Sequence, residues 1–277
     1  MSSMIQSYGL RSDRVVVAKR RGAWFQLHLK NMLDVYLYYS GYCDYAETRF
    51  LELNLRPGDV VFDVGANLGY YSLLAARKVS PTGQVHAFEI SADELTKFEN
   101  NVVLNEFASA ITVNRVAVAA AVGTVPITPT FGAGTTSIDI EETYRAEIIA
   151  ATSLDQYVQD RKLLRVDYLK CDIEGAESLM LEGAQALLEH NRPVMLLELN
   201  PAALARFGSS VGDVLRATNR HEYSLFCFTS SIKGIELRRM TKDDEPTGEG
   251  FTNVVAIPQE RLPKLSARLP LRLPDRV

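Results

Sequence analysis

The residues of this sequence best suited to chemistry are four carboxylates, each of which follows a short apolar run. They are Asp63, Glu89, Asp172 and Glu198. Such runs are typical of buried strands in α/β proteins, whose ligands bind outside the carboxyl ends of the strands. Four like charges at one sheet edge repel each other unless a partner is present. We therefore expect these carboxylates to face a ligand, a metal ion or fixed hydrogen-bond donors.

A glycine-containing turn follows the first of these runs. Residues 63–69 read Asp-Val-Gly-Ala-Asn-Leu-Gly, and a helical pattern begins directly after them. The glycines let the backbone approach a ligand closely, but their spacing differs from the Gly-x-Gly-x-x-Gly of dinucleotide sites. An acid ahead of the turn would repel a pyrophosphate, and it suits a cationic or hydroxyl-rich ligand such as S-adenosylmethionine. Asp63 either contacts that ligand or holds backbone N–H groups of the turn.

Glu89 comes roughly twenty residues after this turn. A carboxylate at that spacing binds the ribose hydroxyls of an adenosine ligand. The alternative is an acid at a helix N-terminus, because Ser91 and Asp93 begin a helical run. The spacing favours the ribose role.

A second acidic motif, Asp-Ile-Glu-Gly-Ala-Glu, occupies residues 172–177. Asp172 or Glu174 is a candidate base or orienting group, with Glu198 nearby. In the alternative, one of these acids caps the following helix and stabilises it by about 1 kcal/mol. A more specific hypothesis is a Mg2+ ion held by oxygens of Asp172, Glu198 and Asn200. An ordinary hydrogen-bonded pocket would present the same side chains.

Apolar runs and helical patterns alternate through most of the chain. Strands are predicted at Val60–Val64, Gln84–Phe88, Ile111–Val118, Gly123–Thr130 (hairpin-like), Tyr168–Cys171, Val194–Leu197, Tyr223–Phe228 and Phe251–Ile257. Helices are predicted at Tyr71–Val79, Ala92–Asn105, Ala176–Glu189 and Ser210–Thr218. This alternation favours an α/β fold with a mostly parallel sheet. The last two strands have no strong helix between them and suit an antiparallel pair at one edge.

The composition limits the classes of protein to which the chain can belong. Its 277 residues include 30 basic and 34 acidic side chains, a formal net charge of -4, which argues against a nucleic-acid binder. No stretch has the length of an integral membrane span, and the N-terminus lacks the apolar part of a signal peptide. Three widely spaced cysteines indicate reduced thiols and a cytoplasmic protein. The four histidines are not expected to catalyse, and assembly into a homo-oligomer is left open.

Together these motifs resemble the FkbM-type S-adenosylmethionine-dependent methyltransferases. The resemblance is carried by residues 57–71, 85–89 with 100–105, 152–155 with 169–177, and 193–198. It implies a class I methyltransferase fold, which is a Rossmann-like, mostly parallel sheet of seven strands with helices on both faces. It also implies S-adenosylmethionine as cofactor and methyl transfer, commonly to a hydroxyl oxygen.

The resemblance also suggests roles for individual residues. The cofactor residues expected are Asp63, Gly65, Asn67 and Gly69 on the methionine side, Glu89 on the ribose, Ala117 against the adenine, and Asp172. The family's usual proline after the ribose acid is Ile90 in this chain, which leaves the carboxylate in place. We divide the chain into an N-terminal extension (1–55) that could cover the acceptor site, a cofactor-binding methyltransferase domain (56–260) and a loosely held tail rich in Pro, Leu and basic residues (261–277).

The sequence does not identify the acceptor, for which we expect a small molecule or a glycan, such as a sugar or polyketide. Apart from Glu47, residues 1–55 match the family poorly. Their five tyrosines between residues 36 and 45 suit either stacking on an acceptor or ordinary packing. The loop 131–137 is a second candidate for acceptor contact, or a plain connector. A nicotinamide-dependent oxidoreductase and a non-catalytic protein that binds S-adenosylmethionine are the alternative functions.

Overall fold

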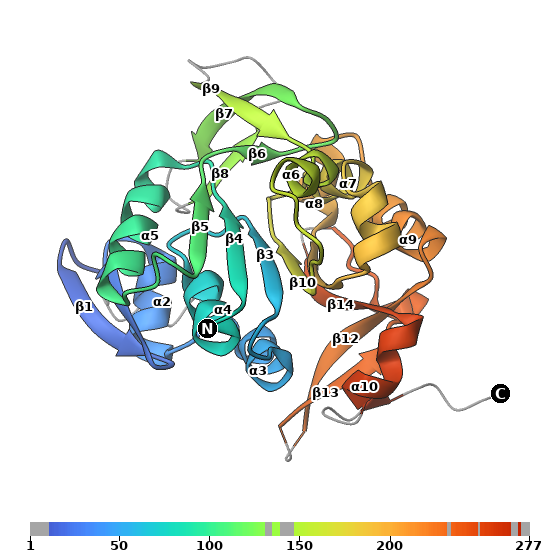
Figure 1. Cartoon of the computed structure of the whole chain (residues 1–277), viewed down its shortest axis with the longest axis horizontal. Coiled ribbons are helices and arrows are strands. Elements are labelled where there is room, and N and C mark those ends of the chain that lie inside the picture. The colour runs from blue at the N-terminus through green and yellow to red at the C-terminus, as the bar shows by residue number, and fades with distance from the viewer. Residues whose placement is uncertain are drawn as a thin grey trace.

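The computed structural model describes residues 11–130, 135–138, 147–231, 234–248, 250–266 and 271–272. A mixed sheet runs through the molecule, with helices on both of its faces (Figure 1). Its strand order is β15-β13-β12-β14-β11-β10-β3-β4-β5. Five of these strands are parallel neighbours: β5 (Ile111–Asn114), β4 (Gln84–Phe88), β3 (Val60–Val64), β10 (Tyr168–Cys171) and β11 (Val194–Leu199).

The remaining strands extend the sheet beyond β11. β14 (Thr252–Pro258) lies antiparallel between β11 and β12 (Tyr223–Ser231), which confirms the predicted antiparallel pair. β13 (Gly234–Arg239) and the short β15 (Leu271–Arg272) then continue the edge. The seven strands from β5 to β12 therefore form the predicted sheet, and the structure adds two strands to it.

Alternate strand residues enter two separate cores, one on each face of the sheet. On β3, for example, Val61 belongs to the first core and Phe62 to the second. This period of two arises because successive strand side chains point to opposite faces. Both faces are apolar because helices cover both of them. The helices α4 (Tyr70–Val79) and α5 (Ala92–Leu104) contribute to the first core, and α6 (Leu154–Asp160), α7 (Glu177–Glu182) and α9 (Val211–Arg220) to the second.

The N-terminal segment packs into the first core. It consists of the hairpin β1 (Val15–Arg20) and β2 (Ala23–His28) followed by α2 (Met32–Ser40) and α3 (Tyr45–Asn54). The backbone N–H of Gln26 donates to Asn101 Oδ1 on α5 at 2.7 Å, and Phe25, Leu37 and Phe50 are fully buried. Burial of several large apolar side chains at about 25 cal/mol per Å² anchors this segment to the sheet.

The structure corrects the prediction of one strand at Ile111–Val118. The chain leaves the main sheet after Asn114 and enters a second, four-stranded sheet of order β6-β9-β7-β8. These strands are β6 (Ala117–Val118), β7 (Gly123–Thr130), β8 (Thr135–Ile138) and β9 (Glu147–Thr152). β-Branched residues stand on both sides of the break, and only the polar pair Asn114-Arg115 marks it in the sequence. The hairpin-like prediction for β7 is confirmed, because β7 pairs antiparallel with β8 and β9.

Two predictions in the C-terminal half are also wrong. The helix expected at Ala176–Glu189 is interrupted: α7 ends at Glu182, Gly183 follows, and the π-helix η1 covers Leu187–Asn191. A Cβ at Gly183 would lie 2.3 Å from the carbonyl oxygen of Ala119, so the chain approaches a neighbouring segment closely here. The first residues of the supposed tail are ordered, because the 3-10 turn η3 (Gln259–Arg261) leads into α10 (Leu262–Ser266).

The other short helices are α8 (Pro201–Arg206) and the 3-10 turn η2 (Lys242–Asp244). Within the described residues, no helix has both the length and the hydropathy needed to cross a bilayer.

Candidate active site

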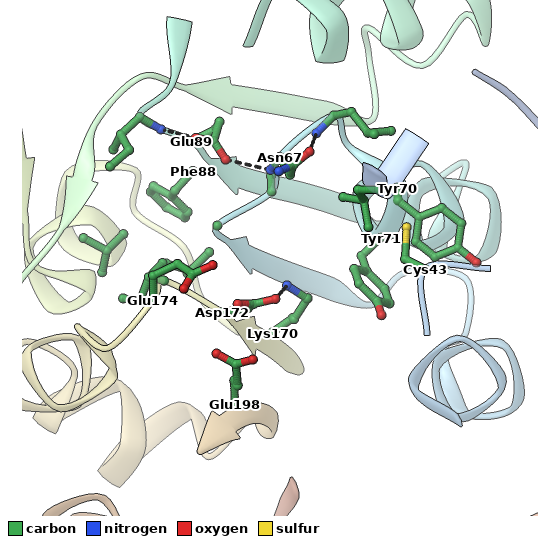
Figure 2. Close-up of a pocket in the computed structure, with 18 of the residues that line it drawn as sticks. Cys43, Asn67, Tyr70, Tyr71, Phe88, Glu89, Lys170, Asp172, Glu174 and Glu198 are labelled. Carbon is green, nitrogen blue, oxygen red and sulfur yellow. Dashed lines mark hydrogen bonds and ion pairs between the residues drawn. The ribbon is translucent and has the colours of Figure 1, made fainter. Parts of the chain in front are cut away.

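A cavity of about 370 Å³ opens at the carboxyl edge of the main sheet (Figure 2). Its walls come from the residues at and just after the ends of β3, β4, β10 and β11. The N-terminal segment and α4 supply a further wall. This is the place where parallel α/β sheets bind their ligands.

The glycine turn after β3 allows this cavity to form. Gly65 has a φ of +80°, and a Cβ there would lie 1.9 Å from the carbonyl oxygen of Asp172. The N–H groups of Gly65 and Ala66 both donate to the carbonyl of Phe88 at 3.0 Å, which ties the turn to β4. Only glycine fits this position, because a side chain would displace the backbone of the neighbouring loop.

Glu89 is fixed at the wall of the cavity by backbone donors. Its Oε2 accepts from the N–H of Asn67 at 2.7 Å (Figure 2). Its Oε1 accepts from the N–H groups of Ile90 and Ser91 at 2.8 Å each. Burial raises the pKa of this carboxyl, and the three N–H groups offset part of that rise. The alternative role for Glu89 was that of an acid at the N-terminus of the following helix. The N-cap of that helix, α5, is Ser91, whose Oγ accepts from Glu94 N at 3.4 Å.

The other residues expected at the cofactor divide into two groups. Gly65, Asn67, Ala117 and Asp172 line the cavity. Asp63 is 1 % exposed and lies outside the lining; its Oδ2 accepts from Ser72 Oγ on α4 at 2.6 Å. Gly69 also lies outside the lining, where it precedes α4 with a φ of +89°. Asp63 therefore joins the strand to the helix, and its expected role at the cofactor stays a prediction.

The structure brings together three of the acids predicted for catalysis. Asp172, Glu174 and Glu198 all line the cavity, and Figure 2 shows Glu198 pointing from β11 toward Asp172. Glu198 lies within β11 and not beyond its end, since the strand continues to Leu199. The helix-terminal role proposed as an alternative belongs to Glu177, which is 1 % exposed and accepts from the N–H groups of Ile173 and Gly175 at 3.0 and 3.3 Å.

Burial and neighbouring charge raise the pKa values of Glu174 and Glu198. Burial, reinforced by the charges of Asp172 and Glu174, raises the pKa of Glu198 to about 8. Burial and the charge of Asp172 also raise the pKa of Glu174. A carboxyl with a pKa near neutrality suits proton transfer at physiological pH.

The predicted Mg2+ site does not fit the side chains present. Asn200 lies outside the cavity lining and caps α8, with its Oδ1 accepting from Ala203 N at 3.1 Å. A cation already stands beside Asp172, because Lys170 Nζ lies 3.3 Å from its Oδ2. Among the residues the structure describes, no group of three or more His, Cys, Asp and Glu side chains is arranged to hold a metal ion.

Sequence reasoning missed a second set of cavity residues. Cys43, Glu47, Tyr71 and Lys170 also line the cavity, and of these the sequence had marked only Glu47, as a match to the family without a role. Burial raises the pKa of Glu47 to about 7, although Lys170 and a hydrogen bond with Tyr71 act in the opposite direction. The one local signal was Lys170, a charged residue inside the apolar run of β10.

Neither the tyrosines nor the loop expected to contact the acceptor contributes a described residue to the wall of the cavity. The tyrosines at 36–45 are absent from the cavity lining; Tyr39 and Tyr45 are 57 % and 46 % exposed, and each packs edge-on against another tyrosine. Residues 131–134 of the predicted acceptor loop lie outside the described residues. Phe251, which is 62 % exposed, lines the cavity instead.

Known proteins resemble this chain in sequence and in fold. The family model for the methyltransferase FkbM domain matches residues 63–225, more than half of the chain. The methyltransferase sdnD of Sordaria araneosa is 28 % identical over 161 residues, which cover 47 % of this chain and 62 % of that protein. The 31-O-demethyl-FK506 methyltransferase FkbM of Streptomyces tacrolimicus is 42 % identical over 59 residues, which cover 21 % of this chain and 22 % of that protein. The chain thus spans less than two thirds of either curated relative.

Solved structures with a similar arrangement include two methyltransferases. The crystal structure of methyltransferase FkbM from Methylobacillus flagellatus has a TM-score of 0.45 and 18 % identity, and covers 81 % of this chain and 54 % of that one. The O-methyltransferase from Bacillus cereus in complex with SAH has a TM-score of 0.41 and 15 % identity, and covers 77 % of this chain and 81 % of that one.

Proposed function

This chain belongs to the FkbM methyltransferase family, and we propose that it transfers a methyl group from S-adenosylmethionine to a hydroxyl oxygen of a small molecule or glycan. Its fold is the class I methyltransferase fold. The observation that carries the proposal is the cavity at the carboxyl edge of the sheet, with a carboxylate fixed by three backbone N–H groups at one end and an acid cluster at the other.

The end of the cavity near Glu89 suits the cofactor. Glu89 carries free lone pairs beyond its three backbone bonds, and a carboxylate can accept from the two ribose hydroxyls. Val116, Ala117 and Phe88 offer an apolar wall for an adenine. Gly65 and Asn67 line the cavity at the turn, where backbone and small side chains could contact the methionine portion.

The opposite end suits an acceptor. When bound, the cofactor supplies a methyl group that its sulfonium has already activated. The chain must then hold an acceptor oxygen in line with that methyl group and take its proton. Asp172, Glu174 and Glu198 face this space, and Asp172 can exchange protons with solvent because its side chain is 45 % exposed.

Two alternative functions are less well supported. A nicotinamide-dependent oxidoreductase would need room for a pyrophosphate near the turn, where Glu89 and Asp172 place negative charge. A protein that only binds the cofactor would not need the acid cluster, in which burial and then mutual repulsion raise the pKa of Glu198 at a cost in stability.

Calorimetric titration of the whole chain with S-adenosylhomocysteine and, separately, with NAD tests the cofactor. We expect binding of the first and none of the second. The variant Glu89→Gln should weaken S-adenosylhomocysteine binding by about tenfold or more, because hydrogen bonds to a charged acceptor contribute about 1.5–3 kcal/mol. The exposed Glu99→Gln on α5 is the matched control. Equal affinity of the two variants would contradict the ribose role.

A methyl-transfer assay with sugars and polyketide alcohols tests the reaction. Methylation of an amine in preference to a hydroxyl would contradict the acceptor class. We also propose a cytoplasmic location on the basis of the three free cysteines, and no nucleic-acid partner on the basis of the net charge of -4.

A further inference from the structure

Lys170 is the feature of the cavity that the proposed function leaves unused. It is the sole Lys or Arg among the described residues that line the cavity, and it is 5 % exposed. It lies on β10, two residues before Asp172, and its Nζ approaches Asp172 Oδ2 to 3.3 Å (Figure 2). Buried lysines are rare unless they are paired. The burial of Lys170 beside Asp172 therefore calls for a functional or structural reason.

The surroundings of Lys170 keep it charged and hold it in place. Burial by itself would lower its pKa, but the charges of the neighbouring acids outweigh burial and raise it. Those acids are Asp172, Asp63 and Glu47. The Nζ also lies 4.9 Å from the centre of the Tyr71 ring, a cation–π distance. Because an ammonium has three N–H donors and no acceptor, Asp172 and the ring of Tyr71 leave it with a donor to spare.

The N-terminal segment completes this arrangement. Glu47 is the third residue of α3, whose N-cap Asp44 accepts from Glu47 N at 3.0 Å. Its carboxyl is 5 % exposed and hydrogen-bonds with the hydroxyl of Tyr71, which in turn places its ring against Lys170. Helix α3 thus reaches the same end of the cavity as Asp172 and sets the position of the lysine.

We propose that the acceptor hydroxyl binds between Lys170 and Asp172, with the Lys170 ammonium donating to its oxygen and the Asp172 carboxylate accepting its proton. This inference rests on the proposed function. In the transfer, the acceptor O–H bond breaks and its proton passes to Asp172. The acceptor oxygen bonds to the methyl carbon as the carbon–sulfur bond breaks, and the sulfur keeps that electron pair. Asp172 then releases its proton to solvent.

Two consequences distinguish this arrangement from simple packing. A fixed ammonium stabilises negative charge that develops on the acceptor oxygen, so Lys170 performs the electrostatic task that was predicted for Mg2+. The same ammonium repels a protonated amine, so the site selects hydroxyl over amine acceptors. Glu47 and Tyr71 are positioning residues, because they act through Lys170.

The test compares Lys170→Ala with the unaltered chain and with Lys30→Met, a control at an exposed lysine. S-Adenosylhomocysteine affinity is measured by calorimetry. Transfer is measured from labelled S-adenosylmethionine to methyl α-D-glucopyranoside, cyclohexane-1,2-diol and a macrolactone alcohol. We expect Lys170→Ala to lower kcat by about 10²- to 10³-fold, the effect typical of removing one such donor. Its affinity for S-adenosylhomocysteine should stay near that of the unaltered chain, and added ethylammonium should restore part of kcat.

Several outcomes overturn the inference. They are a kcat unchanged by Lys170→Ala, a parallel loss of S-adenosylhomocysteine affinity, or an unaltered chain that binds S-adenosylhomocysteine but methylates none of the three probes. An unaltered chain that fails to bind S-adenosylhomocysteine refutes the proposed function itself. If Lys170→Ala does not fold, Tyr71→Phe provides the measurement, because it keeps the ring but removes the bond to Glu47. It should lower kcat by a smaller factor without changing S-adenosylhomocysteine affinity, and an unchanged kcat would count against the inference.

Discussion

The buried carboxyl of Glu177 should make the protein less stable as the pH rises, and replacing it with glutamine should remove that effect. Burial raises the pKa of Glu177 from 4.5 to about 7, even though the N–H groups of Ile173 and Gly175 act in the opposite direction. Its Oε2 has no hydrogen-bond partner among the described residues. The carboxyl nevertheless holds the loop that carries Asp172, so the candidate active site depends on a side chain that is costly to ionise.

The sign and size of the effect follow from proton linkage. Between pH 4.5 and about 7 the folded state keeps the Glu177 proton, whereas the unfolded chain has released it. Stability therefore falls as the pH rises through this window, by up to about 3 kcal/mol. In Glu177→Gln, the amide oxygen can still accept from Ile173 and Gly175, and there is no charge to bury. The variant should match the unaltered chain near pH 4.5 and exceed its stability by up to about 3 kcal/mol at pH 8.5.

Urea denaturation at several pH values measures this difference. The shift of Glu47 cancels in the comparison of the two proteins. The charge of Glu177 is one of the causes of the raised pKa of Glu198, so Glu177→Gln also relieves part of that shift, which adds to the variant's advantage at high pH. The matched control is Glu182→Gln, which makes the same substitution at the exposed end of the same helix, α7. An unaltered chain more stable than Glu177→Gln at pH 8.5 would refute the reasoning, since the ionised carboxylate would then gain more from its two N–H donors than burial costs.

Three further predictions concern the cavity and the residues once expected to hold a metal ion there. Gly65→Ala should lower S-adenosylhomocysteine affinity by about 100-fold or more, because its Cβ would meet the carbonyl oxygen of Asp172 at 1.9 Å; calorimetry with normal affinity would show that the turn can move aside. Turnover in excess EDTA should equal turnover in added Mg2+, because Lys170 occupies the cation position; a loss reversed by Mg2+ would restore the metal hypothesis. Asn200→Ala should lower the free energy of unfolding by about 1 kcal/mol through loss of the α8 cap, and a selective fall in kcat with unchanged stability would contradict a capping role.

Local patterns predicted the central part of the fold. The strands β3, β4 and β10 were predicted with the bounds that the structure has, because each is a short apolar run that ends at a polar turn. The turn at Gly65 was also predictable from the sequence. Its φ of +80° favours glycine, so the glycine itself marks the turn. These features depend on residues adjacent in the chain, so one sequence is sufficient to locate them.

Elements without a local signal could not be predicted in this way. The segment from Ile111 to Val118 is mostly apolar and β-branched, and its only break is the polar pair Asn114-Arg115, where the chain changes from one sheet to another. Two polar residues also occur within single strands, so this signal was too weak to divide the segment. The helices α2 and α3 have mixed faces, and they are stabilised by packing against the sheet more than by their own pattern. The predicted division at residue 55 remains a prediction, although the segment before it shares the first core.

By itself, the sequence determined that carboxylates would gather at one sheet edge, because strand ends and parallel topology place Glu89 and Asp172 there. Only the tertiary structure decided which groups meet them. Glu47 and Lys170 lie far apart in the sequence, on opposite sides of the glycine turn. Packing of α3 against the sheet brings them to one cavity. The raised pKa values of Glu47 and Glu198 likewise arise from burial and neighbouring charge. Both are properties of three-dimensional surroundings, which no run of adjacent residues specifies.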